Sequence, residues 1–204
     1  WNVSSHYRND RKKRHAATGE YPVLYPFDPK FESFCERLFE KARITNDDPW
    51  LFGHFSDNEL PFREKGIVEL YLSHPKDDPN HLAAHKFLQD RKVKKAGWKE
   101  DRDFLELVVD TYYRKVTSAL KKNDPNHLYL GTRLHGRALQ SEQIFVAAGK
   151  YADVISVNYY HRWTPEKERI ENWSALAGKP ILITEWYAMA EDSVVVTNNA
   201  REFH

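Results

Sequence analysis

The sequence predicts an α/β fold in which short parallel strands alternate with helices. Two observations indicate this class. From residue 128 onward, apolar runs of strand length alternate with longer segments of helical periodicity. These runs are nearly continuous in apolar residues, as expected for strands that helices cover. The chain has 204 residues, of which 41% are hydrophobic and 30% charged, so residues 1–204 are expected to form a single globular domain.

The charge balance and the cysteine content exclude several kinds of protein. The formal net charge is +1, from 31 basic and 30 acidic residues, so we expect no overall attraction to nucleic acid or to an anionic membrane. The sequence holds no apolar run long enough to span a bilayer. Cys35 is the only cysteine, which excludes internal disulfides and cysteine-based metal clusters. Its apolar surroundings predict a buried thiol.

The first part of the chain is predicted to contain one helix and one strand. The first thirty residues are expected to be irregular, up to Asp28, which is placed to cap a helix. The apolar pattern of that helix continues to Ala42. A strand over 50–55 follows, and Pro61 prevents further pairing beyond it.

The middle of the chain is predicted to be mainly helical. Residues 63–100 are polar and rich in lysine, with a helical pattern around 82–88. The clearest helix covers about 101–122, where apolar residues recur at intervals of three and four. A strand over 128–134 comes next, and then a helix over 141–151 that begins at Ser141 as its N-cap.

The last part of the chain repeats the strand–helix–strand pattern. A strand over 154–159 is followed by a helix over 165–177, which Gly178 is expected to close as a C-cap. A further strand over 181–184 ends at a glutamate. Strands that alternate with helices imply a parallel sheet, and the (β/α)8 TIM barrel is its common closed form. A closed barrel needs eight strands and about 250 residues. The chain, which starts at Trp1 rather than Met, is therefore expected to hold only about four of the eight strands, with flanking sequence missing.

Two glutamates that directly follow predicted strands are the candidate catalytic residues. Chemistry in parallel β/α barrels lies at the carboxyl ends of the strands, so Glu59 and Glu185 are expected to face one cleft despite their separation in sequence. Glycoside hydrolysis requires two carboxyl groups, one to protonate the leaving oxygen and one to attack the anomeric carbon. Either glutamate alone would fit a solvated strand end equally well.

The residues around both glutamates resemble a known signature. Asn58-Glu59 and, three strands further on, Thr184-Glu185-Trp186 are similar to the motifs of the clan A retaining glycoside hydrolases. In that clan the acid/base follows an asparagine after the fourth barrel strand, and the nucleophile ends the seventh. The resemblance therefore implies that this chain holds about strands four to seven of the barrel. Residues 27–61 and 124–188 further resemble the β-agarase type, glycoside hydrolase family 50 and its relatives. The motifs that carry this likeness are PWLFGHFSDNELP, NHLYLGTRLHG, YADVISVNYY and KPILITE.

The resemblance implies a role for each catalytic residue. Glu59 would act first as general acid and then as general base, and Glu185 would be the nucleophile. Asn58 would bind the sugar 2-hydroxyl. Tyr159 or Tyr160 would donate its hydroxyl to the nucleophile; strand alternation leaves both open, and Tyr159 is preferred.

The resemblance also implies further substrate-binding residues. His135 would contact sugar hydroxyls. Arg133 would do the same, or would pair with a carboxylate inside the barrel. Trp186 and Trp163 are candidate platforms for stacking sugar rings, and Trp163 would alternatively anchor the following helix.

The function implied is the hydrolysis, with retention, of β-glycosidic bonds in an agarose-like or other galactan polysaccharide or its oligosaccharides. The alternatives are a clan A β-galactosidase, mannanase or glucanase, and a sugar-binding barrel without catalysis. Retaining hydrolysis requires no metal or other cofactor, and His81 and His85 lack the adjacent glutamate of a metalloprotease helix. A polymeric substrate implies a secreted or periplasmic protein. The balanced charge and the lack of a long apolar run predict no nucleic-acid partner and no membrane span.

Overall fold

The computed structural model describes residues 1–11, 24–160 and 162–187. The helices are α1 (Val3–Arg11), α2 (Pro29–Phe39), α3 (Ile67–Leu72), α4 (Pro79–Asp90), α5 (Trp98–Asn123), α6 (Glu142–Gly149) and α7 (Lys167–Ala177), with 3-10 turns η1 (Glu40–Thr45) and η2 (Gly136–Gln140). The strands are β1 (Gly53–His54), β2 (Leu128–Tyr129), β3 (Ile155–Asn158) and β4 (Ile181–Glu185). Within these residues, no helix is long and apolar enough to cross a membrane.

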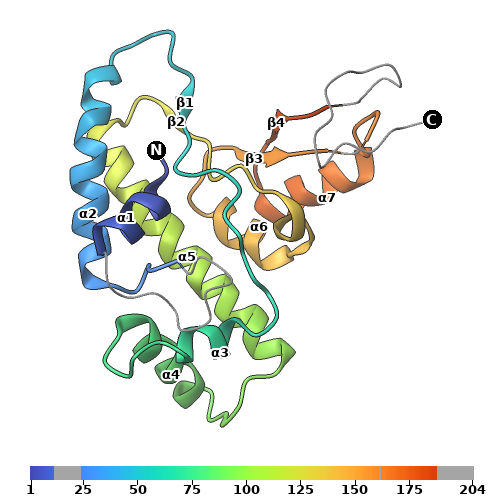
Figure 1. The fold of residues 1–204 in the computed structure, drawn as a ribbon. Coiled ribbons are helices and arrows are strands. Elements are labelled where there is room, and N and C mark those ends of the chain that lie inside the picture. The colour runs from blue at the N-terminus through green and yellow to red at the C-terminus, as the bar shows by residue number, and fades with distance from the viewer. Residues whose placement is uncertain (12–23, 161, 188–204) are drawn as a thin grey trace, which may run out of the picture.

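The strands lie side by side in the order in which they occur in the chain. β1 pairs in parallel with β2, and β3 pairs in parallel with β4. The two pairs are joined by a parallel bridge between Leu134 and Val157 and by a 2.9 Å hydrogen bond from the Asp153 amide to the Tyr129 carbonyl. Figure 1 shows helices beside this short array of strands. The predicted parallel α/β architecture is confirmed, although the described residues form only four short strands and no closed barrel.

The predicted strand over 128–134 is interrupted after Tyr129. Gly131 has a φ of +78° and Arg133 a φ of +51°, and a left-handed residue cannot continue an extended strand. The chain still follows β1, because the Ser56 amide donates to the Gly131 carbonyl at 3.0 Å. The interruption turns the end of this segment toward the residues that follow β1.

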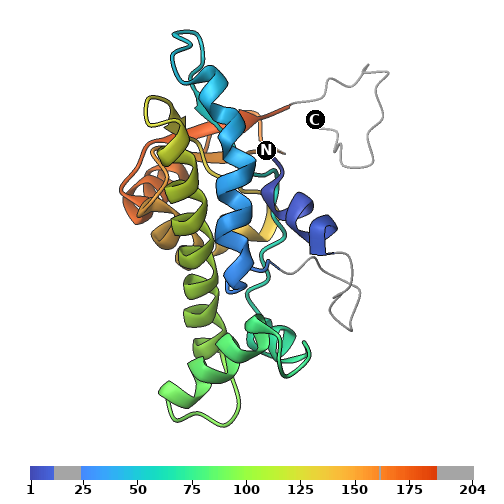
Figure 2. The ribbon, with the colours of Figure 1, turned by 90° about the vertical axis from the view of Figure 1, so that its left-hand side faces the viewer.

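The long helix α5 lies beside α2, as Figures 1 and 2 both show. Its buried face meets the apolar face of α2, where the rings of Phe31 and Tyr112 lie 5.8 Å apart. Asp28 caps α2 as predicted, accepting a hydrogen bond from the Lys30 amide at 2.9 Å. Cys35 is buried in this interface, so burial raises the pKa of its thiol far above the ordinary value.

Helices α6 and α7 pack closely behind β3 and β4. Phe145 of α6 stacks on Trp173 of α7, with ring centroids 5.4 Å apart. Gly178 ends α7 in the left-handed conformation, with a φ of +62°, as predicted for a C-cap glycine. Ser141 stands at the N-cap position of α6, but its side chain makes no capping bond. Its hydroxyl instead donates to Glu64 at 3.2 Å, so the predicted N-cap position is confirmed without a side-chain capping bond.

Two short helices between β1 and α5 form an insert that extends away from the strands, at the bottom of Figure 1. The predicted helical pattern at 82–88 lies within α4, whereas α3 was not predicted. The carboxylate of Asp101 in α5 accepts hydrogen bonds from the amides of Gly66 and Val68 at 2.7 and 3.1 Å. α3 therefore begins where a residue far along the chain caps it.

The prediction that the first thirty residues are irregular is wrong for the start of the chain. Residues Val3–Arg11 form α1, and the Val3 amide donates to the carbonyl of Ser56 at 3.0 Å. Residues 12–23 lie outside the described part. α1 thus contacts the segment that leads from β1 toward Glu59.

Candidate active site

The candidate active site lies where the parallel strands end. The residues that meet there come from the segments after β1 and β2, from the end of β3 and its following loop, and from the end of β4. They are Glu59, Arg133, His135, Asn158, Tyr160 and Glu185. Parallel strands place their carboxyl ends on one side of the sheet, which is why residues so distant in sequence come together.

Glu59 is held in an unusual backbone conformation. Its φ is +51°, which is uncommon for residues other than glycine and is concentrated at functional sites. The Glu59 amide donates to the carbonyls of Thr132 and Arg133 at 3.1 and 3.3 Å. Its carboxylate accepts a hydrogen bond from the Asn158 amide group at 2.8 Å, and Nδ1 of His135 lies 3.6 Å from the same oxygen. Backbone and side chain of Glu59 are therefore both fixed by the neighbouring strand ends.

A buried polar network lies immediately before Glu59. Asp57 accepts a hydrogen bond from the Ser4 amide at 3.0 Å and another from the Tyr112 hydroxyl. Ser56 shares a 2.8 Å hydrogen bond with the Tyr129 hydroxyl. Burial raises the pKa of Asp57 from 3.8 to about 6, although its hydrogen bonds favour the charged form. This network was not predicted; its only sequence signal is a Ser-Asp pair at the end of an apolar strand.

Each carboxylate oxygen of Glu185 has its own donor. The Arg133 guanidinium forms an ion pair with Oε1, and the Tyr160 hydroxyl donates to Oε2. Arg133 has a positive φ, and its amide donates to the Ser156 hydroxyl at 3.0 Å. Of the two roles expected for Arg133, the structure shows pairing with a carboxylate. Glu185 is half-buried, and its contacts suit an anionic nucleophile.

The preference for Tyr159 as the partner of Glu185 was wrong. The Tyr159 hydroxyl donates to Glu166 at 2.6 Å, and its ring packs edge-on against Trp173 of α7. Asn158 points toward Glu59, so alternation sends Tyr159 to the helix side of β3 and returns Tyr160 to the site. Strand alternation alone could not assign either face, because the deciding contact joins Asn158 to Glu59, which follows another strand.

The two glutamates are linked through shared neighbours. The ring of His135, next to Glu59, lies edge-on to the ring of Tyr160 at 5.5 Å, and Tyr160 donates to Glu185. Asn158, which donates to Glu59, accepts a 2.8 Å hydrogen bond from Thr184. Both glutamates thus border one polar site, with Asn158 as a member that sequence reasoning missed.

Three predicted substrate-binding residues are exposed, namely Asn58, Trp163 and Trp186. Asn58 is exposed, and its side-chain oxygen is 3.5 Å from the Asn158 amide nitrogen. Trp186 is half exposed, and its indole N–H donates to the Arg162 carbonyl at 2.9 Å. Trp163 is 54% exposed, which does not favour a role as an anchor for the following helix. Their exposure leaves the side chains accessible to a ligand.

A buried cluster at the opposite end of the strands holds potential metal ligands. His54, Asp124 and His127 offer ligand atoms within 4.8 Å of one another. Both histidines contact the Asp124 carboxylate at 2.8 Å, and Nε2 of His127 donates to the Asp48 carbonyl at 2.9 Å. These hydrogen bonds raise the pKa of His127. The contacts of His127 suit an imidazolium that donates through both ring nitrogens. The three side chains thus form a hydrogen-bonded cluster.

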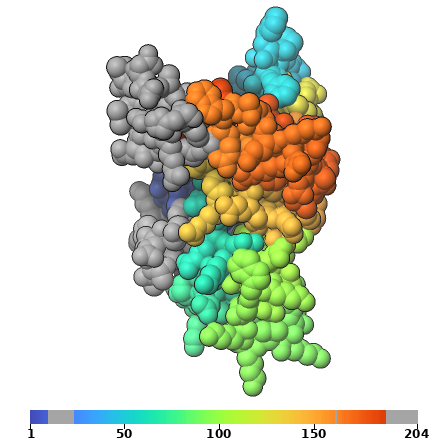
Figure 3. Space-filling model, turned by 90° about the vertical axis from the view of Figure 1, so that its right-hand side faces the viewer, coloured from blue at the N-terminus to red at the C-terminus, as the bar shows by residue number. Residues whose placement is uncertain are grey.

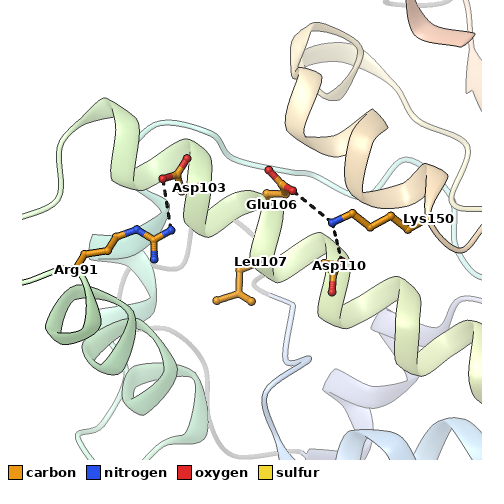
Figure 4. Close-up of a pocket in the computed structure, with 6 residues that line it drawn as sticks. All are labelled: Arg91, Asp103, Glu106, Leu107, Asp110 and Lys150. Atoms are coloured by element: carbon orange, nitrogen blue, oxygen red, sulfur yellow. Dashed lines mark hydrogen bonds and ion pairs between the residues drawn. The ribbon is translucent and has the colours of Figure 1, made fainter. Parts of the chain in front are cut away.

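A hollow on the outer face of α5 has no connection with the site. It lies between the end of α4 and the end of α6 (Figure 4). Arg91 pairs with Asp103 at 3.5 Å, and Lys150 pairs with Glu106 and Asp110 at 3.4 and 3.1 Å. Its two cations thus pair with its three carboxylates at an exposed surface.

The fold and the site define an α/β protein with two glutamates facing one polar site at the carboxyl ends of parallel strands. The comparisons with known proteins add its relationship: the chain is homologous to the β-agarases of glycoside hydrolase family 50. It is 29% identical to β-agarase B of Vibrio sp. (strain JT0107), over 84% of this chain and 22% of that protein. It is 33% identical to β-agarase A of the same strain, over 48% and 10%.

Solved structures extend the likeness to the fold. The crystal structure of BpGH50 matches with a TM-score of 0.82 and 30% identity, over 94% of this chain and 45% of that chain. The structure of an exo-β-agarase matches with a TM-score of 0.66 and 25% identity, over 83% and 28%. No family model matches the chain. The chain thus spans less than half the length of each of these relatives.

Proposed function

We propose that this chain supplies the catalytic carboxyl groups of a retaining glycoside hydrolase acting on an agarose-like galactan or its oligosaccharides. The observation that carries the proposal is the pair Glu59 and Glu185, one after β1 and one at the end of β4, which are linked through the contacts of His135, Tyr160 and Asn158. Homology to β-agarases supports β-linked galactan as the substrate class.

The proposal includes a barrel to which this chain contributes about half. β1 to β4 would be the fourth to seventh strands of a (β/α)8 barrel. All five residues of β4 are only partly buried, and one edge of β4 pairs with no strand among the described residues. An eighth strand beside β4, and the first three beside β1, would complete the barrel.

In the first step, Glu59 protonates the glycosidic oxygen while a carboxylate oxygen of Glu185 attacks the anomeric carbon. The bond to the leaving sugar breaks, and a covalent glycosyl-enzyme forms. Arg133 and Tyr160 hold the attacking carboxylate in place before the reaction. Asn58 would bind the 2-hydroxyl of the reacting sugar.

In the second step, the ionised Glu59 removes a proton from water, and the water oxygen attacks the anomeric carbon. The bond to Glu185 breaks, the sugar leaves with its original configuration, and Glu59 is protonated again. Two displacements at one carbon give retention, for which the two carboxyl groups need to lie about 5 Å apart.

The test uses the natural full-length protein. We expect Glu185→Gln to abolish turnover of agaro-oligosaccharides and of an aryl β-galactoside, with an unchanged circular dichroism spectrum. A 2-fluoro-glycosyl inhibitor should add one sugar mass to the wild-type protein and none to the variant. Unchanged activity in Glu185→Gln would refute the assignment, and failure to label the wild type would favour a sugar-binding protein without catalysis.

The substrate class needs its own measurement. A panel of agarose, β-galactoside, mannan and glucan substrates separates an agarase from the other clan A specificities. We expect the agar-type substrate to give the highest kcat/KM, and a preference for mannan or glucan would contradict it. We also propose that the protein is exported, since its polymeric substrate cannot enter the cell; assay of culture fractions tests this.

A further inference from the structure

We propose that a groove running from Glu59 to Trp98 binds additional uncharged sugar units of the polysaccharide, with Trp98 as a stacking platform. The inference rests on the proposed function and extends the substrate beyond the reacting bond. The groove has a volume of about 920 Å³, at the upper end of the usual range of about 300–1,000 Å³ for ligand pockets. That size suits an oligosaccharide better than a single ring.

The groove begins inside the candidate active site. Glu59 and His135 line one end of it, the loop at 60–66 and the turn η2 form its sides, and Trp98 stands on the first turn of α5. Figure 3 shows these segments meeting on one face, in teal, yellow and green. A chain of sugars that reaches Glu59 through this groove would therefore pass the indole of Trp98.

Trp98 has the exposure that a platform requires. Its side chain is 55% exposed, whereas tryptophan is usually highly buried because of its large apolar surface. A sugar ring offers one face of C–H groups that packs on an indole, and its hydroxyls remain at the edge for hydrogen bonds. Buried Leu105 and Ile144 also line the groove, so apolar surface is not confined to the indole.

The walls of the groove are held in place before any ligand binds. Asp101 of α5 accepts hydrogen bonds from the Gly66 and Val68 amides. Ser141, at the start of α6, donates to Glu64 of the loop at 3.2 Å, and the Arg63 guanidinium donates to the Lys65 carbonyl at 2.8 Å. A preformed groove reduces the conformational entropy lost on binding.

The charges of the groove predict a neutral ligand. Its cations and carboxylates are equal in number, so their formal charges cancel; they are Arg63, Lys65, Arg137, Glu59, Glu64 and Glu69. A site for sulfated or uronic sugars would need an excess of positive charge. Charged side chains of both signs supply hydrogen-bond donors and acceptors that match the hydroxyl groups of an uncharged galactan.

Binding calorimetry on the natural full-length protein tests the groove. Short and long neutral agaro-oligosaccharides are titrated into the Glu185→Gln variant, with and without Trp98→Ala. We expect Trp98→Ala to weaken binding of the long ligands by about tenfold, to weaken short ligands less, and Trp98→Phe to recover part of the loss. Trp50→Ala is the matched control, because Trp50 is 92% exposed and does not line the groove.

Each outcome decides between the two proposals. If Trp98→Ala and the parent Glu185→Gln variant bind long ligands with equal affinity, the proposal that the groove binds sugar units is overturned. This holds whether or not the wild-type protein hydrolyses these ligands. A Trp98-dependent affinity in a protein that the 2-fluoro inhibitor does not label keeps the groove and removes the proposed catalysis. Absence of binding for oligosaccharides of every length also overturns the binding proposal. Tighter binding of a sulfated galactan than of a neutral one overturns the predicted preference for uncharged ligands.

Discussion

The Tyr160 hydroxyl donates a hydrogen bond to Oε2 of Glu185, and the hydroxyl of Tyr159 points the other way, to Glu166 beside α7. These neighbouring tyrosines, which directly follow β3, thus point to opposite sides of the sheet. Because they have the same side chain, they form a matched pair for experiment.

Tyr160→Phe should lower kcat by about 10- to 100-fold, since a hydrogen bond to a charged group contributes about 1.5–3 kcal/mol. Tyr159→Phe should leave kcat near the wild-type value and reduce the free energy of unfolding by about 1 kcal/mol. Steady-state kinetics and urea unfolding of both variants measure these effects. A larger kcat loss in Tyr159→Phe would contradict the assignment.

Arg133→Lys should also reduce kcat, by about tenfold or more, because lysine cannot reproduce the planar geometry with which a guanidinium meets a carboxylate. Arg133→Met should reduce it further, since no positive charge then faces Glu185. Hydrolysis of an aryl β-galactoside measures both variants. Arg37→Lys, at an exposed position on α2, is the control, and equal rates in all three variants would show that the ion pair is dispensable.

Asp57→Asn should change how stability depends on pH. The pKa of Asp57 is about 6 in the folded protein and 3.8 ordinarily, so its stabilising contribution is complete below about pH 4 and is lost as pH rises through 6. At pH 7 the buried carboxylate then costs about 3 kcal/mol.

The measurement for Asp57 is thermal unfolding of the wild type and Asp57→Asn between pH 4 and pH 7. We expect the variant to gain stability relative to the wild type as the pH rises, because asparagine does not ionise. A difference that stays constant across the range would argue that Asp57 titrates normally.

Gly149→Ala should destabilise the protein strongly, by about 3 kcal/mol. A Cβ at this position would lie 2.1 Å from the Ala177 carbonyl oxygen, so α6 and α7 would have to separate. Gly136→Ala is the comparison, since nothing lies within 4 Å of its added Cβ and only its φ of +58° opposes the change, which costs about 1 kcal/mol. Urea unfolding ranks the two, and a smaller effect at Gly149 would disprove tight helix packing there.

The regular elements of the second half could be predicted because their signals are local. The apolar runs at 154–159 and 181–184 correspond to β3 and β4, and Gly178 ends α7 as its sequence position indicates. The interruption after Tyr129 and the start of α3 could not be predicted in this way. Both depend on partners elsewhere, such as the Asp101 carboxylate that caps α3.

In the candidate site, likewise, only the residues with local sequence signals could be predicted. Glu59 and Glu185 follow predicted strands, and their flanking residues resemble a catalytic signature, so both could be proposed from sequence. The contact between Asp57 and Tyr112 joins residues 55 positions apart, and that between Asn158 and Glu59 joins residues 99 apart. A single sequence carries no periodic signal for such pairs, which is why the network beneath the site went unpredicted.

The cluster of His54, Asp124 and His127 affects how any pH–activity curve of this protein should be interpreted. The raised pKa of His127 means that its hydrogen bonds to Asp124 and to the Asp48 carbonyl are complete at lower pH and weaken as the pH rises through that value. A decline in activity on the alkaline side would then include loosening of the cluster that joins β1 to the start of β2. That contribution should persist in unfolding measurements on a Glu59→Gln variant.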